Sequence, residues 1–162
     1  LLYRPYGHPY LENPKFSFEM KRGWKGPEFI EGGVRFRHPK RRADISIAYH
    51  IEGSNGWVEP KLYRRWMREQ GSTEDRHVVE EVKISSYPAA HVVYTTHTYD
   101  PEYLLGVRSD VGMTELFMLP DDQGIFVIRF EAPQRWFQRY RSVFTRFIDS
   151  LALAVYSEPV EQ

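Results

Sequence analysis

Cysteine is absent from this 162-residue chain. Its absence excludes disulfide bonds, zinc fingers, iron–sulfur clusters and thiol nucleophiles. The chain also lacks any uncharged apolar run of the ~18 residues that a membrane-spanning helix needs. A net charge of either sign is missing too, because 22 lysines and arginines balance 22 aspartates and glutamates. With 41% hydrophobic residues, the sequence predicts one soluble, folded domain.

Catalytic motifs are missing as well. No G-x-S-x-G, glycine-rich phosphate loop or H-E-x-x-H sequence occurs. His91 and His97 share one face of an expected strand, but six residues at ~3.3 Å each separate them by about 20 Å, too far to share a metal. A neighbouring strand could add a partner such as His50 or Glu80. We therefore expect no catalytic residues, no cofactor and no metal site.

The zero net charge hides an uneven distribution. Residues 1–42 hold ten lysines and arginines against four acids, which gives +6, and the remaining 120 residues carry −6. The chain as a whole therefore does not predict nucleic-acid binding, but a local electrostatic contact remains possible.

Hydrophobic periodicity predicts most of the secondary structure. Apolar residues alternate with polar ones in 44–52, where Ile45, Ile47, Tyr49 and Ile51 share one face, as expected of a half-buried strand. A loop around 23–29 is expected to pack Trp24 and Phe29 against the core. The other expected strands are 16–20, 33–37, 78–85, 89–99, 111–119 and 124–131. Helical spacing predicts a helix over 59–70 and a long C-terminal helix over 133–154.

Several expected strands are apolar on both faces, which requires cover on both sides. The fold class is therefore α+β: a mainly antiparallel sheet of six to seven strands, with the long C-terminal helix on one face and the shorter helix or loops on the other (an α/β/α sandwich). We expect residues 1–14 to be an extended N-terminal tether, 15–157 a single domain, and 158–162 a tail.

Three segments, together with this order of elements, resemble the PsbP-like and Mog-type α/β sandwich. They are 16–24 (FSFEMKRGW), the apolar strand 124–130 and the amphipathic helix end 144–151. Lys21 stands where such starts often carry proline. The resemblance implies a non-catalytic binding or assembly domain, in bacteria often an exported lipoprotein. It also implies another protein as partner and an extracytoplasmic location, with the membrane reached only through an N-terminal anchor outside this chain.

Two kinds of residue are candidates for binding. Arg35, Arg37, Arg41 and Arg42 could form a patch for an anionic partner, or could be a solvated strand edge and turn that protects the sheet. Trp57 and Tyr103, in expected loops, could contact a protein or cap the core. Two further hypotheses stay open: a small-ligand-binding or hydrolytic domain that uses the open side of the sheet at His50, His91 or His97, and a cytosolic adaptor that binds through residues 35–42.

Overall fold

The computed structural model describes residues 2–8, 11, 13–69, 76–99 and 108–155. The elements follow in the order β1 (Tyr3–Tyr6), β2 (Phe16–Lys21), β3 (Lys25–Ile30), β4 (Gly33–Arg37), β5 (Asp44–Ile51), α1 (Pro60–Glu69), β6 (Arg76–Ile84), β7 (Tyr87–Tyr99), β8 (Arg108–Pro120), β9 (Gly124–Pro133), α2 (Gln134–Ser150) and β10 (Ala152–Leu153). Among the described residues, no helix is long and apolar enough to cross a membrane.

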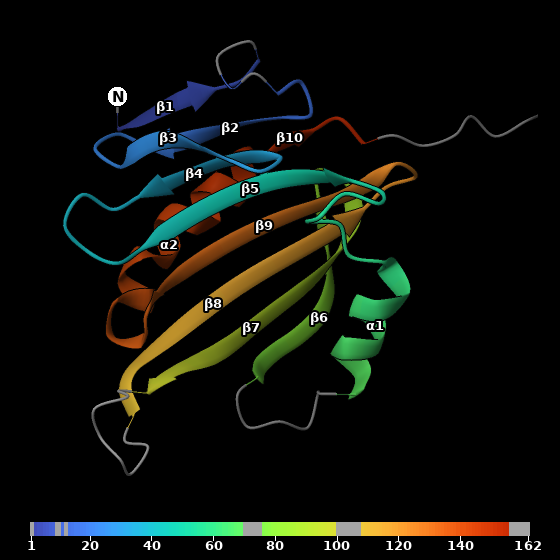
Figure 1. Cartoon of the computed structure of the whole chain (residues 1–162). Helices are drawn as coiled ribbons and strands as arrows, with labels where there is room; N and C mark the ends of the chain where they lie inside the picture. Colours follow the sequence, from blue (N-terminus) through green and yellow to red (C-terminus); the bar gives the residue numbers. More distant parts are fainter. Residues whose placement is uncertain (1, 9–10, 12, 70–75, 100–107, 156–162) are drawn as a thin grey trace, which may run out of the picture.

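Seven antiparallel strands form the main sheet, in the order β3-β4-β5-β9-β8-β7-β6. A second sheet has the order β1-β2-β10. Helix α2 runs behind the main sheet, and α1 lies in front of it at one side (Figure 1). The predicted α+β sandwich with a mainly antiparallel sheet and a long C-terminal helix is confirmed.

Aromatic side chains fill the layer between α2 and the main sheet. Phe137, Phe144 and Phe147 project from buried positions of α2, because positions three and four apart share one face of a helix. Phe130 of β9 contacts Phe137 at 5.0 Å and Phe144 at 5.4 Å between ring centroids. The small sheet seals the side of this layer through Phe18 of β2, whose ring centroid is 4.7 Å from that of Phe147.

The N-terminal segment differs from the prediction. Tyr3–Tyr6, part of the expected tether, is a strand paired with β2, with Tyr6 opposite Phe18. The Tyr6 ring lies 5.0 Å from that of Phe36, so aromatic packing holds this strand on the domain. β2 itself joins the small sheet rather than the main one.

The segment expected as a loop at 23–29 is mostly strand β3, at the edge of the main sheet. Trp24 is buried as expected, but Phe29 is 58% exposed, so its predicted place in the core is wrong. Phe29 lies opposite Val34 in the β3–β4 register and so shares its face, but β3 is the edge strand of the main sheet and its ring is left uncovered.

Replacing Phe18 by alanine should lower the free energy of unfolding by about 3–5 kcal/mol, because the ring is buried against Phe147 and Phe36 and its loss leaves a cavity. Urea denaturation measures this change. Phe29→Ala is the matched control, and its exposed ring should cost less than about 1 kcal/mol. Equal costs for the two variants would contradict the described packing of β2.

Candidate protein-binding surface

The structure divides the expected basic run 35–42 between two sides of the molecule. In β4, Val34 and Phe36 face α2, so Arg35 and Arg37 face the opposite side of the sheet. There an Arg35 Nη2–H donates a 2.6 Å hydrogen bond to Glu28, which lowers the pKa of that carboxyl group. Arg37 Nε lies 3.3 Å from Glu28 and 3.6 Å from Asp44. Carboxylates therefore compensate both cations.

Arg42 lies near Asp44, the carboxylate that Arg37 also approaches. It lines a shallow depression together with Asp44 and Glu131, so its surroundings are also acidic. The four arginines of the expected patch therefore do not gather on one surface. Whether Arg35, Arg37 or Arg42 binds a partner stays a prediction.

Arg41 instead joins residues of α2 around one indole ring. Its guanidinium carbon lies 4.3 Å from the centroid of the Trp136 ring, and those of Arg135 and Arg139 lie 5.8 and 5.6 Å from it. A cation over an aromatic face is stabilised by about 0.5–1 kcal/mol at an exposed site. Three guanidinium groups from two separate segments therefore share one tryptophan.

His38 fixes the loop that carries Arg41. Its Nδ1 accepts the backbone N–H of Lys40 at 3.1 Å and that of Arg41 at 3.0 Å, so this nitrogen is unprotonated. The His38 ring packs 4.5 Å from Tyr140 and 5.5 Å from Trp24. Burial lowers the pKa of His38, and the nearby cations lower it further, so the ring stays neutral at pH 7.

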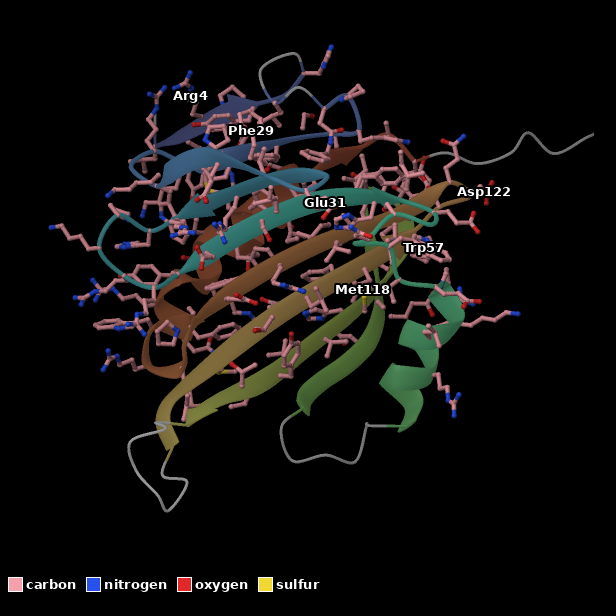
Figure 2. All side chains as sticks on the ribbon, viewed as in Figure 1. Arg4, Phe29, Glu31, Trp57, Met118 and Asp122 are labelled. Atoms are coloured by element: carbon pink, nitrogen blue, oxygen red, sulfur yellow. The ribbon has the colours of Figure 1, made fainter. Side chains whose placement is uncertain are left out.

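Five cations thus surround Trp136 and His38, and together with Trp136 we call them the cationic surface. The five are Lys21, Lys40, Arg41, Arg135 and Arg139. Within the described residues none of them forms an ion pair, and the first turn of α2 carries no acidic residue. In Figure 2, nitrogen-tipped side chains gather at the left of the view, where the turn between β4 and β5 and the start of α2 lie.

Trp57 and Tyr103 are the two aromatic residues that were expected in loops as candidates for binding. Trp57 is half-buried and packs against the small apolar cluster on the face of the main sheet away from α2, and Figure 2 shows it close to Met118, a member of that cluster. It therefore does not join the cationic surface. Tyr103 lies outside the described residues.

A separate polar cluster lies under α2. His91, which is 6% exposed, contacts Glu80 through Nδ1 at 2.8 Å and Glu115 through Nε2 at 2.7 Å. Arg141 of α2 donates two hydrogen bonds to the Glu115 carboxylate, at 3.1 and 2.9 Å. The buried carboxylate is thus paired from two sides, as a charge in a protein interior requires.

His50 and Glu80 were the two residues expected as possible partners of His91 from a neighbouring strand. Glu80 contacts His91, whereas His50 faces the opposite side of the sheet. Glu115 and Arg141 also belong to the His91 cluster, and the sequence analysis did not identify them. A glutamate between Met113 and Phe117, on the inward face of an apolar strand, was the available signal for a buried charge pair. Among the described residues, no group of three histidines or carboxylates could hold a metal ion.

The pKa of His91 reflects two opposing effects. Burial alone would lower it, but the hydrogen bonds to Glu115 and Glu80 raise it above its usual value. Burial likewise opposes the charged form of Glu115, yet His91 and Arg141 hold its pKa below the usual range. Both ring nitrogens of His91 lie at carboxylate oxygens, which accept hydrogen bonds, so the geometry fits a protonated ring, and the cluster joins β6, β7, β8 and α2 electrostatically.

The raised pKa of His91 predicts a pH-dependent stability. Because this pKa is higher in the folded chain than the ~6.5 of an unfolded histidine, the protonated ring stabilises the fold fully below about pH 6.5. That contribution is lost as the pH rises through the folded pKa. The difference in unfolding free energy between wild type and His91→Gln, measured with urea, should therefore be larger at pH 6 than at pH 9. The expected increase is about 1.4 kcal/mol for each tenfold difference in proton affinity between the folded and the unfolded ring.

His50 is the matched control with the opposite sign. Burial lowers its pKa, and Glu31 opposes this only in part, so neutral His50 stabilises the fold above about pH 6.5 and this contribution is lost as the pH falls through the folded pKa. The difference between wild type and His50→Gln should shrink in acid. The same trend for both variants would contradict the described His91 cluster.

Comparison with known proteins gives a fold but no family. No family model matches the chain, and no curated protein matches its sequence. A protein from Bacteroides thetaiotaomicron superposes with a TM-score of 0.60 at 16% identity, over 98% of this chain and 51% of the other, so this chain spans about half its length.

Two further solved structures match along nearly their whole length. The cyanobacterial PsbP of Synechocystis sp. PCC 6803 superposes with a TM-score of 0.56 at 13% identity, covering 93% of this chain and 92% of that protein. LpqN of Mycobacterium tuberculosis, which is involved in cell envelope biogenesis, gives 0.53 at 9% identity over 93% and 90%. The predicted structural resemblance is therefore confirmed, and the chain has the PsbP-like α/β sandwich fold.

Proposed function

We propose that this chain is a non-catalytic binding domain that docks its cationic surface onto an acidic region of another protein. The observation that carries the proposal is the gathering of five cations around Trp136 and His38, with no ion pair to any of them among the described residues. Complementary charges steer association and fix orientation. Tryptophan and arginine are also enriched at the energetically important positions of protein interfaces.

A protein fits this surface better than a nucleic acid. The chain has no net charge, so it offers no long-range attraction to a polyanion. Binding of single strands also uses aromatic rings on which bases stack. The Trp136 ring is already covered by Arg41, whose guanidinium carbon lies 4.3 Å from the ring centroid. Carboxylates, in contrast, match the outward N–H groups of the arginines.

We also propose that the domain catalyses no reaction. The His91 cluster is the most acid–base-like arrangement described, but both ring nitrogens are engaged by carboxylates. Arg141 occupies the carboxylate of Glu115. No side chain of a nucleophilic type is among the described hydrogen-bond partners of this cluster, so its geometry favours a structural role.

We further propose that the domain works outside the cytoplasm and is anchored through its N-terminus. LpqN, which shares the fold, is involved in cell envelope biogenesis. The start of β1 lies at the surface of the small sheet, where a preceding segment can leave the domain (Figure 1). Cell fractionation of the full-length gene product should place it in the envelope fraction. A cytosolic location without an export signal would contradict this part and favour a cytosolic adaptor.

Charge reversal tests the docking surface. The double variant Arg135→Glu and Arg139→Glu should weaken binding to a labelled 20-residue poly-L-glutamate at least about tenfold, which corresponds to about 1.4 kcal/mol, because repulsion replaces attraction. Fluorescence anisotropy at low salt measures the affinity, and binding by the wild type should weaken as salt rises.

The matched control reverses two exposed cations of α1, Lys61 and Arg64. It changes the net charge equally and should alter the affinity less than about twofold. Equal losses in the two double variants would show that only net charge matters and would contradict the proposed surface. Wild-type binding that does not respond to salt would contradict it as well.

A further inference from the structure

The face of the main sheet that α2 leaves free contains a cavity. It has a volume of about 550 Å³ and lies between the sheet, the segment after β5 and the first turn of α1. Figure 1 shows α1 in front of the sheet at this side. Ligand sites in proteins have volumes of about 300–1,000 Å³, so this one has the size of a small-molecule site.

Apolar side chains form most of the wall. Leu116 and Met118 of β8 and Val127 of β9 line the floor. Val58 and Leu62 form the opposite side and remain 37% and 56% exposed, so large apolar groups border the cavity without protein cover. Uncovered apolar surface in a concavity marks a place where something apolar binds.

A few polar groups mark one part of the wall: Ser46, His50 and Arg129. Ser46 is directly opposite Arg129 in the β5–β9 register. Gly56 lets the His50 ring lie directly against the backbone, since a Cβ atom at that position would overlap the ring. Burial lowers the pKa of His50, so the ring presents uncharged nitrogen atoms at neutral pH.

Arg129 is the only arginine or lysine that lines this cavity among the described residues. Its carboxylate partner is Glu131, with Nη1 and Oε1 3.7 Å apart and both side chains nearly half exposed. An exposed pair at that distance contributes little stability, about 0–1 kcal/mol. The planar guanidinium has five N–H donors, so it can still bind an incoming carboxylate through two of them.

We propose that this cavity binds a small amphipathic molecule, with an apolar chain against Leu116, Met118 and Leu62 and a carboxylate at Arg129. The site is independent of the cationic surface, because the α2 layer and the sheet separate the two. Its occupant is not cleaved by a serine–histidine pair. Ser46 and His50 are four residues apart on one strand, or about 13 Å, which is beyond hydrogen-bond reach.

Isothermal titration calorimetry with dodecanoate and with 1-dodecanol separates the two halves of the site. Arg129→Gln should weaken dodecanoate binding about tenfold and leave dodecanol binding within twofold, because only the first ligand carries a charge. Arg22→Gln removes an exposed cation elsewhere and should change neither affinity.

A second variant tests the apolar wall. Leu62→Glu places a charge on an exposed position of α1, so the fold is retained, and it should abolish binding of both ligands. A Val127→Trp variant, which fills the cavity, should do the same, and thermal unfolding checks that each variant is folded.

Three results would overturn the proposal. One is no binding of dodecanoate by the wild type. Another is equal weakening by Arg129→Gln and Arg22→Gln, which would show a nonspecific charge effect. The last is unchanged affinity for both ligands in Leu62→Glu. None of these results bears on polyglutamate binding, so failure here is distinguishable from failure of the proposed function.

Discussion

The aromatic layer between α2 and the main sheet is the constraint on which the rest of the structure depends. Phe144 contacts Phe117, Phe130 and Phe147, and these rings bring together β8, β9 and the helix. Burying side chains of this size contributes about 1.5–3 kcal/mol each. Because α2 and β2 seal one face of the sheet, only the opposite face and the ends of the elements remain for binding.

The same layer determines where charge can lie. Under α2, the buried carboxylate of Glu115 is paired with His91 and Arg141, so no net charge is left unbalanced in the interior. At the start of α2, the helix brings Arg135 and Arg139 beside the loop that carries Arg41. The positive charge of residues 1–42 therefore becomes a surface only by combining with α2.

The sequence could predict elements with strong periodicity but not their partners. The alternation in β5 and the stripe in α2 give both elements within a few residues, since each burial pattern is repeated several times. β1 and β3 contain proline and lie beside glycine, so their patterns are too short and interrupted to be recognised. Alternation also fixes which side chains of β2 are buried but not which sheet the strand joins.

Contacts between distant segments are the least predictable part of the site. Arg41 and Trp136 meet only because α2 packs across the sheet, and Glu115 reaches His91 only through the β7–β8 register, which places Phe117 opposite His91.

Trp136 and Trp57 lie on different sides of the sheet, so their indole N–H signals are separate reporters in a ¹H–¹⁵N NMR titration with poly-L-glutamate. If the cationic surface is the docking site, the Trp136 signal shifts and the Trp57 signal does not. A shift confined to Trp57, or none at Trp136, would contradict it.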